Sequence, residues 1–424
     1  MINPPFQALE GCCVALQQSI PVRLQFGSSG EFAAEVESSR VAVFRPGARA
    51  KTDAADAIGR ALAQPLELPT LDQALVPDDR VVIALDRDVP HADDVIAAIW
   101  SYLDRRGIPA ENVTILQPAA ISAHRTADPR GKLSADIRDA ITLKTHDPTA
   151  ENSCRYLATT SGGERIHLAT ELVDADFVLT VGVTAFDSLL GYRGTSSVLF
   201  PGLSTVDSIK RTIGQGHQEL SPREQRPLRQ LVDEIAWLMG IQFTVQLVPA
   251  VEGGFCSILA GNSESVFTRS REILTDEWLI SMPERVQTVV AAISADASGH
   301  GWQQLGRTLA MARQLVEPGG RIVVLSEISA EPGEGIELLR QVEDAENALQ
   351  PLRASTPPDM QPAMQIASAA AWARLFLFSR LDEGLVEDLF MYPLADLAEV
   401  GRIIETSDSC ALIGSAQHAF GIVE

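Results

Sequence analysis

The sequence contains very little lysine and a marked shortage of positive charge, and both restrict the partners that the protein can have. Lysine occurs only four times in 424 residues, at Lys51, Lys132, Lys144 and Lys210, so arginine carries almost all of the positive charge. The chain has 34 basic against 56 acidic residues and a net charge of −22. Such an excess of negative charge repels phosphate backbones and anionic membrane surfaces. We therefore expect a small molecule, rather than nucleic acid or a membrane, as the partner.

Features of secreted and membrane proteins are also missing. The cysteines are five in number, scattered and without a C-x-x-C pair: Cys12, Cys13, Cys154, Cys256 and Cys410. This pattern favours reduced thiols in a cytoplasm over a disulfide framework. No basic residue precedes Arg23, as a secretory signal would require, and no apolar run is long enough to cross a membrane. We predict a cytoplasmic globular protein.

Short β-branched runs alternate with longer helical patterns along the chain. The strand-like runs lie at 81–85, 113–116, 177–181, 243–247, 289–293, 321–325, 374–378 and 410–413, and the helical patterns at 93–105, 133–140, 223–239 and 302–316. This alternation predicts an α/β fold with mainly parallel sheets. The length allows two domains, and we predict them at 1–262 and 263–424, divided near A-G-N-S-E-S. The four prolines of 351–362 predict a loop within the second domain.

One stretch, from Phe177 to Leu203, combines a strand-like run with a glycine-rich loop. Gly191 and Gly194 flank Tyr192 and Arg193 in this loop, and Asp187 precedes them. Glycine permits positive φ angles and lets a backbone approach a ligand closely. We therefore predict a ligand site after this strand.

This stretch resembles the corresponding segment of the nickel-dependent lactate racemase family. There a strand ends in a proline–histidine pair, followed by G-[YF]-S-G-G-x-K and a P-G pair. The resemblance implies a two-domain fold with an interdomain cleft. It also implies racemisation of a 2-hydroxy acid, with two histidines exchanging protons and a lysine-tethered nickel-pincer nucleotide accepting hydride. Aligned on Gly191, Asp187 takes the position of one catalytic histidine and Ser197 that of the tethering lysine.

Other family segments match in part. Asp86, in A-L-D-R-D-V-P after a strand, matches the aspartate of the family's D-x-T-R-P, although Val89 replaces its arginine. Without the resemblance, an aspartate here is more often a helix cap. His124 and Arg125 match an H-R pair that contains the other catalytic histidine; a lone loop histidine is more often structural. Imidazole titrates near neutral pH, which suits proton transfer.

Two further positions complete the predicted site. His217 lies a few residues beyond the family's nickel-ligating histidine and is a candidate metal ligand, against the alternative of a surface histidine. Counting back from P-G-G at 318–320, Gln304 and Arg307 take the positions of a glutamine and a lysine. Arginine in place of lysine can still hold a carboxylate.

The resemblance therefore predicts a divergent racemase or epimerase of a small 2-hydroxy acid. Its catalytic residues are His124 and Asp187, and its cofactor is a nickel-pincer nucleotide held without the lysine tether. The other predicted residues divide into substrate-binding Asp86, Arg125, Tyr192, Gln304 and Arg307, cofactor-binding Gly191, Gly194 and Ser197, and metal-binding His217.

Two alternatives remain open at this point. Loss of the lysine and of one histidine favours a catalytically inactive binding or regulatory homologue. Gly299, Gly301 and Gly306, followed by a helix, a strand and Glu327, imitate a dinucleotide-binding unit and favour an NAD(P)-dependent oxidoreductase. In the latter segment, glycine at an ordinary strand-to-helix turn explains the pattern at least as well.

Overall fold

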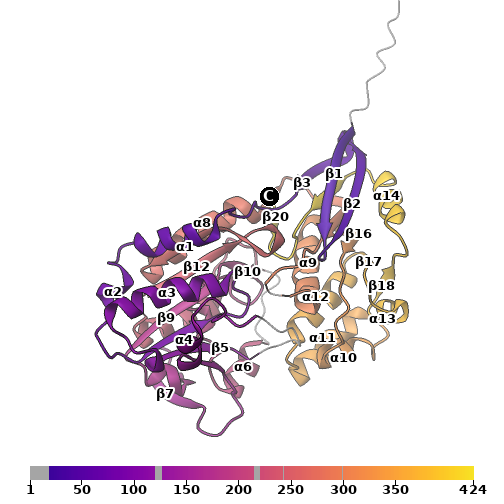
Figure 1. Cartoon of the computed structure of the whole chain (residues 1–424). Helices are drawn as coiled ribbons and strands as arrows, with labels where there is room; N and C mark the ends of the chain where they lie inside the picture. Colours follow the sequence, from indigo (N-terminus) through magenta and orange to yellow (C-terminus); the bar gives the residue numbers. More distant parts are fainter. Residues whose placement is uncertain (1–18, 120–126, 214–219, 242, 298) are drawn as a thin grey trace, which may run out of the picture.

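Two lobes, each built on a six-stranded sheet, make up the protein (Figure 1). The computed structural model describes residues 19–119, 127–213, 220–241, 243–297 and 299–424. In the first lobe the strand order is β13-β12-β9-β4-β5-β6, and every neighbouring pair is parallel except β12 with β13. The strands are β4 (Val81–Leu85), β5 (Val113–Gln117), β6 (Thr142–Thr145), β9 (Phe177–Val183), β12 (Phe243–Pro249) and β13 (Phe255–Gly261).

The central strands of this sheet are apolar on both faces because helices cover both. Side chains alternate along a strand. Val81 and Ile83 of β4 therefore pack into one core with α1 (Ala54–Ala63), α2 (Leu71–Ala74) and α3 (Ala92–Arg106). Val82 and Ala84 face a second core with α7 (Pro227–Met239). Burial on both faces explains why these strands appear as continuous apolar runs in the sequence.

Smaller elements surround this sheet. They are α4 (Ala135–Ala140), β7 (Cys154–Thr159), β8 (Arg165–Ala169), α5 (Thr170–Val173), β10 (Ala185–Asp187), β11 (Gly191–Arg193), η3 (Thr195–Val198) and α6 (Val206–Ile213). β7 with β8 and β10 with β11 form antiparallel hairpins. The second hairpin follows directly from the buried strand β9, so the end of β9 determines where its side chains lie.

The sheet of the second lobe is entirely parallel, in the order β18-β17-β16-β15-β19-β3. Its strands are β3 (Val41–Arg45), β15 (Val286–Ala292), β16 (Val316–Leu325), β17 (Arg374–Phe378), β18 (Met391–Pro393) and β19 (Cys410–Ile413). One face packs on α9 (Trp302–Leu315), α10 (Glu334–Leu339), α11 (Ala345–Ser355) and α12 (Met360–Ala370). The other face packs on the hairpin β1 (Ser19–Phe26)–β2 (Gly30–Glu37) and on α14 (Leu397–Glu405).

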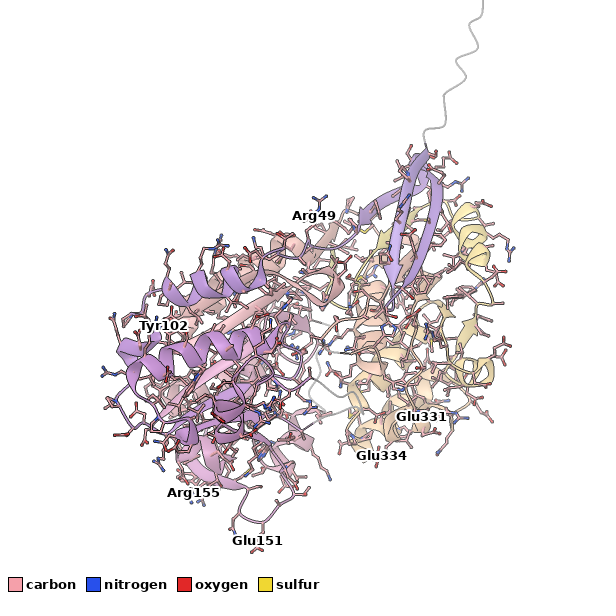
Figure 2. The ribbon with its side chains drawn as sticks, in the orientation of Figure 1. Arg49, Tyr102, Glu151, Arg155, Glu331 and Glu334 are labelled. Carbon is pink, nitrogen blue, oxygen red and sulfur yellow. The ribbon has the colours of Figure 1, made fainter. Side chains whose placement is uncertain are left out.

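The chain passes between the lobes in both directions. After β3 in the second sheet, the segment that contains Arg49 leads to α1 in the first lobe (Figure 2). The chain returns through α8 (Ser263–Trp278), which packs on β12 and β13, and through β14 (Leu279–Met282), which pairs with the C-terminal β20 (Phe420–Val423). The predicted division at residue 262 stays a prediction, and β3 shows that an N-terminal segment belongs to the second sheet.

The predicted α/β class and mainly parallel sheets are confirmed, whereas the loop predicted over 351–362 is shorter than expected: Pro357 and Pro358 lie in a loop at 356–359, and its two ends are helical. Pro351 lies inside α11, and Pro362 lies in the first turn of α12. Proline is tolerated in a first turn because the N–H groups there have no intrahelical acceptor. Among the described residues, no helix is long and apolar enough to cross a membrane.

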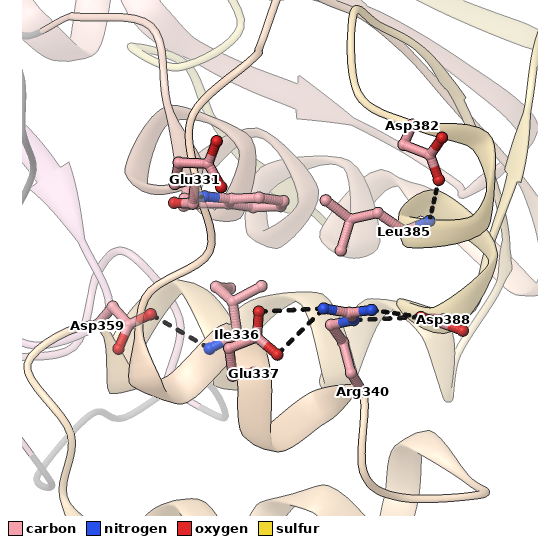
Figure 3. Close-up of polar contacts among 9 residues, drawn as sticks. Glu331, Ile336, Glu337, Arg340, Asp359, Asp382, Leu385 and Asp388 are labelled. Carbon is pink, nitrogen blue, oxygen red and sulfur yellow. Dashed lines mark hydrogen bonds and ion pairs between the residues drawn. The ribbon is translucent and has the colours of Figure 1, made fainter.

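The N-terminus of α10 depends on a buried aspartate from the start of α12 (Figure 3). Asp359 accepts hydrogen bonds from the backbone N–H groups of Gly335 (2.7 Å) and Ile336 (3.2 Å). Arg340, at the end of the same helix, pairs with Glu337 and with Asp388 of α13 (Glu383–Asp388). Asp359 thus satisfies helix-end donors that water cannot reach.

We expect Asp359→Ala to lower the free energy of unfolding by about 1–2 kcal/mol, because two buried donors lose their acceptor. Urea denaturation measures this change. Asp382→Ala is the matched control, since Asp382 caps α13 through Gly384 and Leu385 but is exposed to water. Equal losses in the two variants would contradict the role of burial.

Candidate functional site

The parallel strands of both sheets end at the interface between the lobes, and ligands commonly bind beyond the carboxyl ends of such strands. Asp86 and Asp88 follow β4 of the first sheet, while Asp296 follows β15 and His418 follows β19 of the second. A small cavity of about 10 Å³ lies here, lined by Asp88, Asp296 and His418 together with Arg193 and Arg307. We call it the smaller cavity. Both lobes contribute charged side chains to it.

An ion pair between Arg193 and Asp88 stabilises the first-lobe side of this cavity. Arg193 ends β11, and its Nη2 donates to the Asp88 carboxylate; their side chains are only 15% and 13% exposed. Burial acts to raise the pKa of Asp88, but the charges of Arg193 and Arg307 outweigh it and hold that pKa below its ordinary value. Asp88 is therefore ionised near neutral pH and fixes Arg193 in place.

Asp86 has the opposite electrostatic environment. Burial, and then the negative charge of Asp88, raise the pKa of Asp86 to about 6, although Arg193 opposes the shift. Its Oδ1 accepts a hydrogen bond from the backbone N–H of Arg87 at 2.9 Å. A carboxyl group that titrates near neutral pH can both accept and return a proton. The predicted Asp86 thus lies close to Asp88 and Arg193, two charged residues that line the smaller cavity.

Arg307 projects from α9 of the second lobe toward the first. Its guanidinium makes no hydrogen bond or close ion pair with any residue that the structure describes, although Asp88, Asp187 and Asp296 act on it at longer range. Burial, and then the positive charge of Arg193, lower the pKa of Arg307. A buried cation in this situation gains from a bound anion. Arg307 can therefore hold a ligand carboxylate.

A second and larger cavity, of about 60 Å³, lies between the β10–β11 hairpin and α9. Its lining includes Phe186 and Asp187 of β10, Arg307 and Arg313 of α9, and Phe420 of β20. Arg307 lines both cavities. We call this space the larger cavity, and it continues the site along α9.

The predicted Asp187 and Tyr192 both lie in this hairpin. Asp187 Oδ1 accepts hydrogen bonds from the backbone N–H groups of Leu189 (3.0 Å) and Leu190 (2.8 Å), which close the turn. The ring of Tyr192 packs edge-on against Phe186 and Phe420, and its hydroxyl lies 3.1 Å from Thr275 Oγ1. Tyr192 thus joins the lobes, whereas Asp187 borders the larger cavity.

Comparisons with known proteins agree with this architecture. A model of the lactate racemase N-terminal domain matches residues 26–225. The chain is similar in structure to the lactate racemase apoprotein from Thermoanaerobacterium thermosaccharolyticum, with 17% identity, 95% of this chain and 100% of that chain covered, and a TM-score of 0.76. A structural-genomics protein from Thermotoga maritima shows 13% identity, coverage of 87% and 98%, and a TM-score of 0.65. No curated protein sequence matches.

Residues 26–225 therefore match the lactate racemase N-terminal domain, and the chain as a whole has the lactate racemase fold. The chain differs from the family motifs at chemically important positions as well as in overall identity. Valine, aspartate and serine occupy positions 89, 187 and 197, where the motifs aligned above have arginine, histidine and lysine. The family nevertheless accounts for the two lobes and for a site between them.

The glycine loop of this lactate racemase homologue is held by its own contacts. Gly191 and Gly194 have φ angles of +68° and +145°, and a side chain on Gly194 would press on the amide of Gln246. Gln246 accepts a hydrogen bond from the Thr195 N–H, and Ser197 Oγ accepts one from the Gly194 N–H at 3.1 Å. Ser197 therefore closes the turn that begins η3.

The described residues do not fit a lysine-tethered nickel nucleotide. Ser197 has no amine with which to form the tether. Within the described ranges, no three His, Cys, Asp or Glu side chains are grouped as metal ligands. The predicted His124, Arg125 and His217 lie outside the described residues, so their roles stay predictions.

Gln304 and the glycines around it serve the N-terminus of α9. Gln304 is buried, and its Oε1 accepts a hydrogen bond from the Gly301 N–H at 3.0 Å. A side chain on Gly306 would collide with Pro362 of α12, so this glycine permits close helix packing. The carboxylate of Glu327 is engaged by Ser28 and Arg380. These contacts explain the glycine pattern without a dinucleotide.

Sequence reasoning missed His418 and Asp296 as site residues. His418 Nε2 lies 3.0 Å from Asp296 Oδ2, and Gln417 donates to the same oxygen at 2.7 Å. One signal was present, because His418 follows a strand-like run just as Asp86 does. Nothing in the sequence indicated that these two strands, from different sheets, end at the same cavity.

Proposed function

We propose that the protein binds a small 2-hydroxy acid between its lobes and racemises or epimerises it. The main support is Arg307, a guanidinium without a hydrogen-bonded partner among the described residues, at a cavity that it shares with Asp88. The family supports the reaction class. A carboxylate on Arg307 would fix the substrate where both sheets end.

The protein's own groups divide the work of binding and proton transfer. The planar fork of Arg307 can hold the substrate carboxylate through two parallel hydrogen bonds. Asp86, with a pKa of about 6, would accept and return the proton of the 2-hydroxyl oxygen. The hydride of the adjacent carbon would need a separate acceptor, the chemistry that the family's cofactor would supply if it is bound. The ion pair with Arg193 holds the Asp88 carboxylate beside Asp86. The negative charge of Asp88 favours the protonated form of Asp86. His124 remains the predicted second acid–base group.

The family normally uses a nickel-pincer nucleotide, which this chain would have to hold without a covalent tether. Nickel analysis and an absorbance spectrum of protein produced beside the cofactor-synthesis enzymes test this point. Metal-free protein under those conditions would exclude the nickel form of the proposal.

We expect Arg307→Gln to raise the Kd for a 2-hydroxy acid by roughly 10- to 150-fold, because a hydrogen-bonded ion pair is lost. Arg307→Lys keeps the charge and should recover part of the affinity. Calorimetry gives the Kd, and chiral chromatography of each enantiomer gives the turnover.

The control for this experiment is Arg269→Gln, which removes an exposed arginine paired with Glu272 on α8. It should leave both affinity and turnover unchanged. Unaltered affinity in the Arg307 variant, with a melting temperature like that of the control, would refute the assignment.

A catalytically inactive binding protein is the second candidate. Ser197 favours it, since this hydroxyl closes a turn and cannot replace the tethering lysine. Turnover of any 2-hydroxy acid that disappears in His124→Ala would exclude this alternative.

A further inference from the structure

A second arginine of α9, Arg313, lines the larger cavity and has no counterion among the residues that the structure describes. Its Nε is buried and has no hydrogen-bond acceptor among the described residues. Its guanidinium lies over the ring of Trp372, 5.3 Å from the ring centre. The charged group that acts on it is another cation, Arg285, which donates to the carbonyls at the end of α9.

The other charges of the larger cavity are already used by the fold. Arg226 donates to the carbonyls of Leu220, Ser221 and Glu224. Asp187 closes the β10–β11 turn. Of the described residues, three guanidiniums and one carboxylate therefore line this cavity, in a chain whose net charge is −22. A positive cavity in so acidic a protein indicates an anionic ligand.

Both α9 arginines are destabilised as cations in the unliganded protein. Burial lowers the pKa of Arg307 and of Arg313, and a neighbouring guanidinium lowers each further. A carboxylate beside each would offset the cost of burying the charge. The two arginines are six residues apart, about 9 Å along the helix axis. Ala310 and Met311 lie between them and give the cavity an apolar wall.

We propose that the larger cavity binds a second acidic group of the substrate, so that the substrate is a dicarboxylic 2-hydroxy acid. This inference rests on the proposed function: Arg307 holds the carboxylate next to the reacting carbon, and Arg313 holds the distal one. The carbon chain between them lies against Ala310 and Met311. Phe186 and Phe420, which stack with ring centres 4.7 Å apart, also line the cavity.

Two ligands that differ only in the distal group test the inference. 2-Hydroxyglutarate and 2-hydroxypentanoate have the same carbon chain, and only the former has a second carboxylate. We expect the wild-type protein to bind 2-hydroxyglutarate at least about tenfold more tightly, as a charge-assisted hydrogen bond predicts. Arg313→Gln should abolish that preference and leave the Kd for 2-hydroxypentanoate unchanged. Calorimetry on the full chain measures all four values.

The controls separate this inference from the proposed function. Arg269→Gln should keep the preference, and Arg313→Lys should keep part of it because it retains the charge. Equal affinity for the two ligands in the wild type, or an equal loss of both in Arg313→Gln, would overturn the inference. Glutarate that binds as tightly as 2-hydroxyglutarate, and loses affinity in Arg313→Gln, would support the distal site while refuting a 2-hydroxy-acid function.

Discussion

Replacing Arg193 by glutamine should lower the free energy of unfolding by about 3–5 kcal/mol, because it removes one partner of a buried ion pair. Asp88 would then be an ionised carboxylate, 13% exposed, without its hydrogen-bond donor. Burial already acts to raise the pKa of Asp88, and Arg193 is the first of the charges that oppose it. Chemical denaturation at pH 7 measures the loss.

The pair formed by Arg80 and Asp176 provides a control of the same chemistry at the surface. Its side chains are 61% and 46% exposed, so Arg80→Gln should lower the free energy of unfolding far less than Arg193→Gln does. The double change Arg193→Gln with Asp88→Asn should restore part of the stability, since the buried carboxylate that has lost its donor is then neutral. If Arg193→Gln proves as mild as Arg80→Gln, the site is more hydrated than the structure indicates.

Replacing Asp86 by asparagine should stabilise the protein at pH 7 while it abolishes turnover. Burial and the charge of Asp88 raise the pKa of Asp86 from 3.8 to about 6, so folding favours the protonated carboxyl. The stability that this preference contributes is complete below about pH 4 and is lost as the pH rises through about 6. At pH 7 the ionised group costs up to about 3 kcal/mol, which the neutral asparagine avoids.

A pH series of unfolding experiments tests the sign of this effect. The stability difference between Asp86→Asn and the wild type should grow from pH 4 to pH 7 and then level off. Asp176→Asn is a control of opposite sign, because hydrogen bonding to Arg80 lowers the pKa of Asp176 to about 2. A difference for Asp86→Asn that does not change with pH would refute the raised pKa.

Most elements of the fold could be predicted from the sequence because they bury continuous apolar runs. The predicted strand at 177–181 is the core of β9, and the helical pattern at 93–105 is α3. β3 was not predicted, since it is short and only half-buried and pairs with β19 near the other end of the chain. At 351–362 proline indicated the loop that holds Pro357 and Pro358 but not its bounds, because α11 continues past Pro351 and α12 begins before Pro362.

The site could be predicted only where a local pattern was sufficient. Asp86 directly follows a buried strand, and Arg307 keeps a fixed distance from the P-G-G turn. Arg193 was visible in the glycine loop, but its role depends on Asp88, more than a hundred residues earlier in the chain. His418 lies beside Asp296 because β19 pairs with β15, a pairing between segments more than a hundred residues apart that no short-range signal encodes. Gln304 was predicted to bind substrate, yet its side chain caps its own helix.

The early strand β3 has a consequence for biosynthesis. Its neighbour β19 is synthesised more than 360 residues later. Val41 therefore cannot pair with Cys410, and the edge of that sheet is incomplete, until β19 has left the ribosome. The first sheet takes all its strands from residues 81–261, whereas the second sheet joins β3 (Val41–Arg45) to β19 (Cys410–Ile413) and cannot be completed before residue 413 has been made. Shortening the C-terminal tail should therefore leave an open sheet edge and promote aggregation of nascent chains.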